Sequence, residues 1–385
     1  MIRYLQPGYA NDPINHYANY SMRFSDVKDN YLVWVLAPYL VTDDPNLQYY
    51  YDYTQSIAEY QKVFDELSCE WKWQNVTLDT METIIQSLRQ DSRGKIPLVI
   101  NLCDGDETNA VPGVTVIELL EKNHLIYTGS DTYFYRITTS KIPMKEVFDQ
   151  HQVPTAPWRV VHTEQTNPQV LFQEVGPELM VKPAISGGSM GLTIRNVVST
   201  PDEFRSIMEE MEKGYRGWKL DTGGLFVESF IRGREFTTLV VGSSTSPENI
   251  HVYPAVERVF HSSLPEKEKF LSFDRLWETY DKEVPLQGHL YDYFKCSDEL
   301  NERLERISRQ AFLAVKGMGY GRLDMRMDHT TQNIYVLEIN AQCGLSEDEN
   351  YTSIGAILRL DEKSFTYLIV EIMEDALKRH HSNPT

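Results

Sequence analysis

Long apolar runs and clustered cysteines are both missing from this chain of 385 residues. No stretch approaches the ~18 consecutive apolar residues that a membrane-spanning helix needs. The opening segment Met1–Pro7 lacks the apolar core that is typical of a secretory signal. The four cysteines are far apart, which excludes a CxxC zinc site and argues against a disulfide framework; they are Cys69, Cys103, Cys296 and Cys343. We therefore expect a cytoplasmic protein that does not contact membranes.

Positive charge is also scarce, because 37 lysines and arginines stand against 56 aspartates and glutamates, a net charge of −19. Duplex nucleic acid and anionic membranes would be repelled unless a local basic patch outweighed this sum. An anionic small molecule remains a candidate ligand, since a few lysines and arginines are enough to line one pocket. We predict small-molecule substrates and no nucleic-acid partner.

Neither GxxxxGK[ST] nor GxGxxG occurs, so the chain has no P-loop and no Rossmann fingerprint. Buried-strand patterns at 32–36 and 97–102 instead alternate with helical patterns, as in an open parallel α/β sheet. Further along the chain, short strands separated by turns indicate antiparallel sheets. We expect an α/β plus α+β fold in three units: an N-terminal α/β domain (1–136), a central lid (137–228) and a C-terminal α+β domain (229–385).

The most informative segment is a pair of alternating strand patterns, 322–328 and 334–340, joined by a polar linker. If the linker is centred on Thr331, apolar residues face one another across the two strands: Leu323 with Ile339, Met325 with Leu337, and Met327 with Tyr335. These pairs predict the register of a hairpin that has one buried face.

The other face of this hairpin carries polar side chains. The predicted register sets Asp324 opposite Glu338, and Arg322 opposite Asn340. Two opposed carboxylates repel each other, and a divalent cation between them would offset that cost. Two acids and an amide oxygen form a hard donor set that suits Mg²⁺, which usually completes its shell with water and nucleotide phosphates. The alternative is a solvated face whose acids pair with Arg322 and Arg326.

A lysine precedes a glycine-rich loop in the segment 180–194. Lys182 ends a strand pattern and offers a point charge for phosphate. The residues Leu192–Ile194 are β-like, so we expect the loop to join two strands; a mobile hairpin without function is the plain alternative. The loop exposes backbone N–H groups suited to phosphate oxygens, and its residues include Ser186, Gly187, Gly188 and Ser189.

The same loop matches GxSxG through Gly187, Ser189 and Gly191, which raises the alternative of a serine hydrolase with Ser189 as its nucleophile. A nucleophile elbow needs a strand, a sharp turn and then a helix. The β-like residues after the loop therefore argue against this alternative.

Two further acids lie between the loop and the hairpin: Glu228 ends one apolar strand pattern and Glu235 begins another. The lysine and glycine loop, these glutamates and the terminal Asp…Glu-x-Asn hairpin, in this order, resemble the ATP-grasp superfamily. Within it the chain is most similar to the D-alanine–D-alanine ligase branch, which implies the ATP-grasp fold. The similarity is strongest at 181–191, 227–237 and 321–344.

The resemblance implies a binding site for ATP. Lys141 and Lys182 would contact its phosphates, beneath a lid formed by Ser186–Gly191. Glu228 would lie beside the adenine, and Glu235 would bind the ribose hydroxyls.

The resemblance also implies a metal and a transition-state site. Asp324, Glu338 and Asn340 would hold two Mg²⁺ ions, with Mn²⁺ as an alternative. Arg322 would stabilise the transition state, and the backbone N–H of Gly344 would help to form the oxyanion site. A homodimer is a further expectation from the family.

The substrate region departs from the D-alanine pattern. In that branch a Ser-Leu pair holds the free carboxylate of the second amino acid, and here Glu349 and Asn350 stand at those positions. A carboxylate there would repel a carboxylate. The N-terminal glutamate that orients the first D-alanine is not recognisable, and a tyrosine-rich run that includes Tyr51 occupies about that region. These tyrosines could stack on a planar or bulkier acid, or they could simply cover the sheet edge.

We therefore predict an ATP-dependent, ADP-forming ligase that joins a carboxylate or vinylogous acid to the amino group of an amino acid, with substrates other than two D-alanines. Two alternatives belong to the same branch: an imine-forming ligase like those that build mycosporine-like amino acids, and a D-alanine–D-alanine or other dipeptide ligase. The serine hydrolase and a nucleotide-binding protein without turnover are alternatives from other classes.

Overall fold

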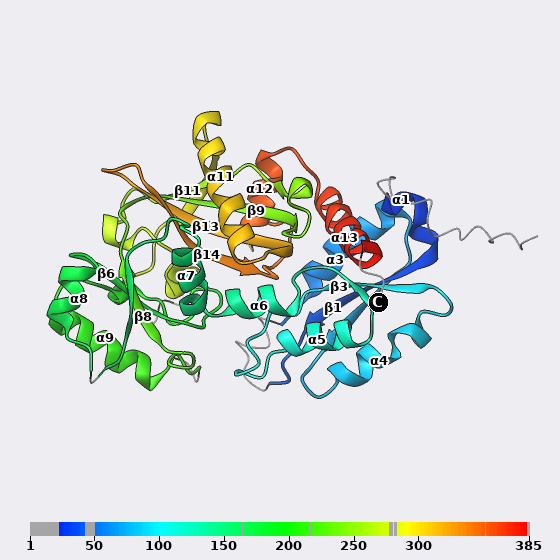
Figure 1. The fold of residues 1–385 in the computed structure, drawn as a ribbon, viewed down its shortest axis with the longest axis horizontal. Coiled ribbons are helices and arrows are strands. Elements are labelled where there is room, and N and C mark those ends of the chain that lie inside the picture. The colour runs from blue at the N-terminus through cyan, green and yellow to red at the C-terminus, as the bar shows by residue number, and fades with distance from the viewer. Residues whose placement is uncertain are drawn as a thin grey trace, which may run out of the picture.

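The computed structural model describes residues 23–42, 51–163, 165–215, 218–276, 280, 283–350 and 352–382. Its strands form three sheets, with the N-terminal sheet on the right of Figure 1, the central sheet on the left and the C-terminal sheet above and between them. This arrangement agrees with the expected α/β plus α+β fold class. Tyr49 and Tyr50 of the tyrosine-rich run lie outside the described residues.

The N-terminal sheet has four parallel strands in the order β2-β1-β3-β4. Helices α4 and α5 cover one face, while α3 and the C-terminal helix α13 cover the other. Burial on both faces explains the nearly continuous apolar character of β1 and β3, which the sequence analysis recognised; β2 is only partly buried and was not predicted. The strands are β1 (Tyr31–Pro38), β2 (Trp71–Val76), β3 (Ile96–Asn101) and β4 (Ile126–Tyr127), and the helices are α3 (Thr54–Leu67), α4 (Met81–Asp91), α5 (Val114–Lys122) and α13 (Phe365–Ser382).

The central sheet is antiparallel, in the order β5-β8-β6-β7. Its apolar face packs against α8 and α9. The elements are β5 (Trp158–Val161), α8 (Pro168–Glu174), β6 (Leu179–Pro183), β7 (Val197–Val198), α9 (Pro201–Lys213) and β8 (Leu225–Ser229).

The expected strand at Leu192–Ile194 is wrong. Ile194–Asn196 forms a 3₁₀ turn, and only the two residues of β7 pair with β6. The Thr193 N–H and hydroxyl both donate to Asn196 Oδ1, at 2.8 and 3.0 Å. These local side-chain bonds compete with a sheet ladder for the backbone and favour the turn.

The C-terminal sheet has six strands, in the order β12-β11-β9-β13-β14 with β10 beside β9. Helices α6, α7 and α11 pack on one face, and α12 and α13 cover only one end of the other. The strands are β9 (Gly233–Ser243), β10 (His251–Val252), β11 (Val256–Phe260), β12 (Tyr291–Lys295), β13 (Met318–Asp328) and β14 (Ile334–Ala341), and the helices are α6 (Thr132–Thr139), α7 (Lys141–Gln150), α11 (Asp298–Ala314) and α12 (Ser353–Leu360).

The terminal hairpin follows the predicted register up to Asp324 and then departs from it. Leu323 faces Ile339 as predicted, but a bulge follows Asp324. Beyond it the predicted pairs are wrong: Met325 faces Val336 and Met327 faces Ile334, while Tyr335 faces Arg326. The bulge leaves Leu337 of β14 unpaired, so that the buried Val336 and Ile334 face Met325 and Met327 in the core, and it adds local twist where the hairpin carries its polar residues.

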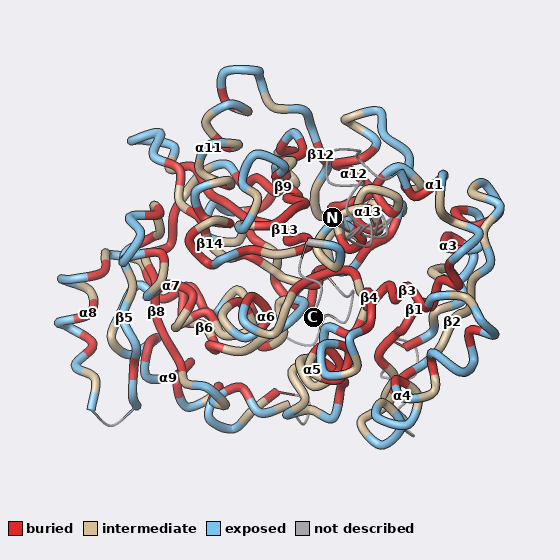
Figure 2. The backbone as a smooth tube through the Cα atoms, turned by 45° about the vertical axis from the view of Figure 1, so that its right-hand side comes forward, coloured by how far each residue is buried: buried red, intermediate tan, exposed pale blue. Residues whose placement is uncertain are grey.

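Figure 2 shows that strands such as β1, β9 and β13 are largely buried, whereas exposed backbone lies on outer elements such as α8 and α4. Among the described residues, no helix combines the length and the apolar character needed to cross a bilayer.

Candidate active site

Four polar side chains converge on the part of the C-terminal sheet that α12 and α13 leave uncovered. Arg322 and Asp324 belong to β13, and Asn340 and Glu338 are their cross-strand partners on β14. The Asn340 side chain donates to Asp324 Oδ2 at 3.3 Å and to Glu338 Oε1 at 3.1 Å. The Arg322 guanidinium donates to Asp324 Oδ2 at 2.9 Å. The structure thus brings together all four hairpin residues that the sequence selected.

The oxygens of this group fit a divalent cation. Asp324 Oδ1 is buried and has no hydrogen-bond partner among the described residues. Burial alone would raise the pKa of Glu338, but Lys141, Lys182 and Arg322 outweigh it and lower that pKa to about 2. No cluster of three His, Cys, Asp or Glu side chains that could hold a metal occurs in the described part of the chain. Asn340 would therefore supply the third ligand oxygen. For this its side-chain amide has to rotate, so that the oxygen and not the NH₂ group faces the cation.

Two lysines predicted to bind phosphate lie beside the hairpin. Lys141 Nζ is 3.2 Å from Glu338 Oε2 and donates to the carbonyl oxygen of Ser186 at 3.1 Å. Lys182 Nζ forms an ion pair with Glu228 Oε1 at 2.5 Å. Burial favours a lower pKa for Lys182, but Glu228 and then Glu338 outweigh it and raise that pKa. Lys182 is therefore a firmly charged group between the central sheet and the hairpin.

A third lysine was not predicted from the sequence. Lys145 lies one turn after Lys141 on α7 and is fully buried. Its Nζ is 2.7 Å from Glu228 Oε2 and donates to Thr155 Oγ1 at 2.7 Å. Glu228 therefore lies between two ammonium groups. The spacing of Lys141 and Lys145, which puts both on one face of a helix, is the signal that could have identified it.

Glu235, expected at the ribose, is also enclosed by two buried cations. It faces Arg258 of β11 on one side and Arg326 of β13 on the other. Arg258 binds the Glu235 carboxylate directly, and Arg326 Nε is 3.8 Å from it. All three residues are buried, and Arg326 Nε has no hydrogen-bond partner within the described residues. Arg326 lies two residues after Asp324 on β13, so Glu235, Arg258 and Arg326 are on the same face of the sheet as Asp324.

The glycine-rich loop turns back on itself through left-handed backbone. Gly188, Ser189 and Gly191 have φ values of 54°, 62° and 75°. A Cβ at Gly191 would lie 2.5 Å from Leu220 Cδ1, so a glycine is required there. The loop leads into the short turn Ile194–Asn196 and not into a helix, which contradicts a nucleophile elbow at Ser189.

The segment after Gly344 is docked on the N-terminal domain. Ser346 Oγ donates to Glu59 Oε1 of α3 at 2.7 Å, and Glu59 is buried. Glu349 pairs with Arg359 at 2.7 Å, and the Asn350 side chain donates to Asp348 Oδ1 at 2.9 Å. Glu349 and Asn350, two of the three predicted substrate residues, therefore already have polar partners.

Tyr51, the third predicted substrate residue, is buried. Its ring packs edge-on against Tyr39, with 6.2 Å between the ring centroids. Little of the Tyr51 ring is therefore available to stack on a substrate in this conformation.

Asp104 is an acid near the hairpin that the sequence did not reveal. It follows β3, at the carboxyl ends of the parallel strands, where open α/β sheets bind ligands. It interacts electrostatically with Cys343 and Tyr320. Asp104 is exposed to solvent.

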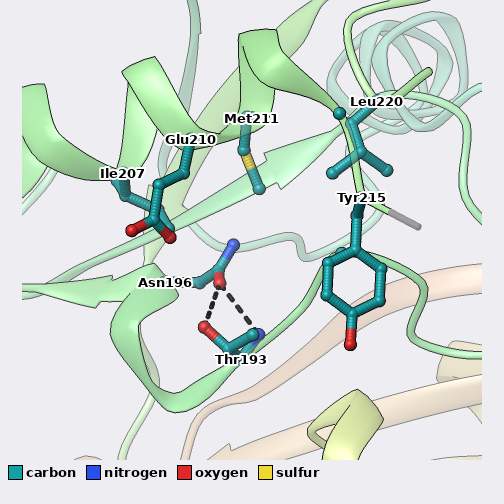
Figure 3. Close-up of a pocket in the computed structure, with 9 residues that line it drawn as sticks. Thr193, Asn196, Ile207, Glu210, Met211, Tyr215 and Leu220 are labelled. Atoms are coloured by element: carbon teal, nitrogen blue, oxygen red, sulfur yellow. Dashed lines mark hydrogen bonds between the residues drawn. The ribbon is translucent and has the colours of Figure 1, made fainter. Parts of the chain in front are cut away.

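A small pocket in the central domain does not belong to this site. It lies between α9 and the turn after the glycine-rich loop, and Figure 3 shows Asn196 bonded to Thr193 beside Met211 and Tyr215. Its acid, Glu210, is already paired with Arg195. The pocket therefore shares no lining residue with the site formed by Arg322, Asp324, Glu338 and Asn340.

Comparison with known families gives a match over more than half of the chain. The family model described as "D-ala D-ala ligase C-terminus" matches residues 147–374. Of the predicted nucleotide- and metal-binding residues, only Lys141 lies outside this span.

Curated relatives match more than two thirds of the chain. The D-alanine–D-alanine ligase of Idiomarina loihiensis is 26% identical over 278 residues, which cover 71% of this chain and 78% of that protein. The corresponding ligase of Pseudoalteromonas translucida is 28% identical over 267 residues, covering 68% and 75%.

Solved structures match nearly the whole chain. The D-alanine–D-alanine ligase of Bacillus anthracis, solved with ATP, superimposes with a TM-score of 0.63 at 18% identity, covering 91% of this chain and 98% of that one. The ligase of Coxiella burnetii gives a TM-score of 0.62 at 17% identity, covering 91% and 96%. At these identities the likeness establishes the fold.

Proposed function

Because the chain belongs to the D-alanine–D-alanine ligase family of the ATP-grasp superfamily, whose members are ATP-dependent, ADP-forming carbon–nitrogen ligases, we propose that it joins the carboxylate of a small acid to an amino group through an acyl phosphate. One observation carries this proposal. Arg322, Asp324 and Glu338 converge around Asn340, within ion-pair distance of Lys141.

In this proposal the nucleotide lies between the central sheet and the terminal hairpin. Lys141 and Lys182 bind its phosphates, and Ser186–Gly191 closes over them to exclude water. Glu228 lies at the adenine end. Glu235 accepts hydrogen bonds from the ribose hydroxyls, and its pairing with Arg258 fixes the carboxylate for that role.

The hairpin acids hold the metal and orient the phosphates. Asp324, Glu338 and Asn340 would hold two magnesium ions. When bound, the ions would neutralise the charge that spreads over the oxygens of the transferring phosphoryl group. The unpartnered Oδ1 of Asp324 and the low pKa of Glu338 support this assignment.

Two displacements make the new bond. An oxygen of the substrate carboxylate attacks the γ-phosphorus of ATP, and ADP leaves with the electrons of the broken P–O bond. The amine nitrogen then attacks the acyl carbon, loses a proton to solvent, and expels phosphate. Arg322 and the Gly344 N–H stabilise the tetrahedral oxyanion that forms when the amine attacks the acyl carbon and that collapses when phosphate leaves. Activation is needed because an amine cannot displace oxide from a free carboxylate.

D-alanine is the first acid and amine to test, because it is the substrate in the names of the relatives. Glu349 favours a second candidate, an acceptor that lacks a nearby free carboxylate, which includes an imine-forming reaction. The Glu349 side chain remains 40% exposed although Arg359 pairs with it. Its charge therefore still disfavours a carboxylate at the acceptor position.

The decisive experiment measures ADP and phosphate release by the purified protein with Mg²⁺ and ATP. Each acid of a panel would be tested with each amine of a second panel, and both panels would include D-alanine. We expect release only when the metal, an acid and an amine are all present, and we expect EDTA to abolish it. Ester cleavage without ATP that is lost in Ser189→Ala would contradict the proposal and support a hydrolase.

The acceptor is tested with the double variant E349S/N350L, which restores the Ser-Leu pair. If Glu349 excludes a carboxylate, this variant should lower KM for D-alanine as acceptor by about tenfold, a gain typical of removing one like-charge contact. Glu347→Ser is the matched control, because Glu347 lies in the same segment but pairs with Lys62 at 3.0 Å. Efficient use of two D-alanines by the wild type would reject the second candidate.

A further inference from the structure

Lys145 has no role in the proposed chemistry, yet it is a fully buried lysine in contact with a residue of the nucleotide site. We propose that Lys145 is a positioning residue for nucleotide binding: it serves as the permanent counter-ion of Glu228 and thereby frees Lys182 to bind the phosphates of ATP. This inference rests on the proposed function, since it takes Lys182 as a phosphate-binding residue.

Glu228 is shared by the two lysines, one at each oxygen. Lys145 Nζ is 2.7 Å from Oε2, and Lys182 Nζ is 2.5 Å from Oε1. Burial alone would raise the pKa of Glu228, but Lys145 and then Lys182 outweigh it and lower the pKa to about 2. The carboxylate is therefore ionised and needs a cation beside it at all times.

The two lysines differ in how firmly they are held. The Lys145 side chain is 1% exposed, and that of Lys182 is 13% exposed. Lys145 also donates to Thr155 Oγ1, which in turn donates to the carbonyl oxygen of Val336 in β14 at 3.2 Å. Lys145 is thus tied to the central sheet and to the hairpin strand, whereas the more exposed Lys182 also interacts electrostatically with Glu338 of the proposed metal site.

This difference assigns a separate task to each lysine. A nucleotide phosphate can attract Lys182 only if Glu228 keeps another cation when Lys182 moves away. Without Lys145 the buried carboxylate would have Lys182 as its remaining counter-ion, and an unpaired buried charge is strongly disfavoured. Glu228 would then hold Lys182 and withdraw it from the nucleotide.

The same helix supports the hairpin side of the site. Lys141 and Lys145 lie on one face of α7, and they pair with Glu338 and Glu228 respectively. One rigid element therefore sets the charge balance of an acid on each side of the nucleotide. A purely structural role for Lys145, in which it merely fills and neutralises the core, is the competing explanation.

A double-mutant cycle separates the two explanations. Isothermal titration calorimetry would give the Kd of the Mg²⁺ complex of adenylyl imidodiphosphate for the wild type, Lys145→Met, Glu228→Gln and the double variant K145M/E228Q. We expect Lys145→Met alone to weaken binding about tenfold, the loss of one charge-assisted contact. In the Glu228→Gln background the same change should alter Kd less than about twofold, because a neutral residue 228 no longer retains Lys182.

Equal effects of Lys145→Met in both backgrounds would overturn the inference. If Lys145→Met alone does not fold in a thermal melt, the comparison of K145M/E228Q with Glu228→Gln still decides. A tenfold difference between those two would overturn the inference, and equal affinity would support it. Lys95→Met is the matched control, since Lys95 pairs with exposed Glu70 at 2.9 Å and should leave Kd unchanged.

The cycle uses no acid or amine substrate, so its failure is distinct from failure of the proposed ligation. If the wild type binds the analogue but no acid–amine pair releases ADP, the proposed function fails and the cycle still judges Lys145. If the wild type does not bind the analogue, both fail.

Discussion

The N-terminal and C-terminal sheets both have buried central strands, but their faces carry different residues. In the N-terminal sheet all eight residues of β1 are buried, and helices cover both faces. In the C-terminal sheet one face packs against α11, while the other carries buried charges at Glu235, Arg258 and Asp324.

The difference shows which forces selected each surface. Apolar burial on both faces stabilises the N-terminal sheet at little risk, since almost no polar group there needs a partner. Charges on the C-terminal sheet lose their hydration, and pairs such as Arg258 with Glu235 offset that cost without a guaranteed gain. A face that retains such charges is one where ligand chemistry, and not stability, sets the residues.

Among the substitutions that test this difference between the two sheets, Glu338→Gln should have the largest effect, and the effect should be on kcat. We expect kcat to fall by roughly 10³-fold, because a neutral side chain would be a much weaker ligand for the proposed magnesium ions. Thermal stability should change little, since Glu338 is only partly buried. ADP release under saturating substrates measures the first, and a thermal melt measures the second.

The control is Glu70→Gln, which removes an exposed acid beside the N-terminal sheet and should leave kcat unchanged. A wild-type rate in Glu338→Gln would contradict the metal role, and with it the contrast between the two sheets.

Leu98→Ala should have the opposite effect, with a large loss of stability and unchanged binding of ATP by the folded protein. Leu98 lies fully buried in β3, so the free energy of unfolding should fall by about 2–5 kcal/mol from lost burial and a cavity. The folded fraction should keep the wild-type KM for ATP. Chemical denaturation and steady-state kinetics measure the two quantities.

Val259→Ala is its matched control on β11, because Val259 is 42% exposed and its truncation should change stability by less than about 0.5 kcal/mol. A raised KM for ATP in Leu98→Ala would show that the N-terminal sheet does more than support the site.

The smallest expected effect is a pH-dependent one at the edge of the C-terminal sheet. His251 Nδ1 is 2.7 Å from Glu371 Oε1, and this hydrogen bond raises the pKa of His251 above its ordinary value of 6.5. A raised folded-state pKa contributes stability that is present below the unfolded pKa and is lost as pH rises through the folded pKa.

His251→Gln should therefore lower Tm more at about pH 6 than at about pH 9. The difference should stay below about 1 kcal/mol, because solvent screens a pair that is one-third exposed. Thermal melts across this range measure it, and a larger loss at the higher pH would contradict the assignment.

Much of the fold could be predicted because it depends on local patterns. The apolar runs at β1 and β3 and the helix Val114–Lys122 follow directly from hydrophobic periodicity. The strand expected at Leu192–Ile194 failed because Thr193 and Asn196 form side-chain bonds that a pattern of β-like residues does not reveal.

The candidate site was predictable where its residues share one hairpin. Asp324 and Glu338 face each other because apolar pairing sets the register, and that register holds as far as the bulge. Arg258 was missed, and Arg326 was considered only as a partner of the hairpin acids, because the residue that both face, Glu235, lies on another strand. Burial and an opposite charge across a sheet leave no mark in the sequence around each residue.

The order of residues alone determined the period of each strand and helix, the charge of the chain and the polar face of its last hairpin, since these depend on neighbours a few positions apart. Only the tertiary structure decided that Glu228 lies between Lys145 and Lys182, and that one oxygen of Asp324 has no hydrogen-bond partner in the described part of the chain. The reason is physical: ion pairing and desolvation depend on distance in space, and folding brings together groups that are far apart along the chain.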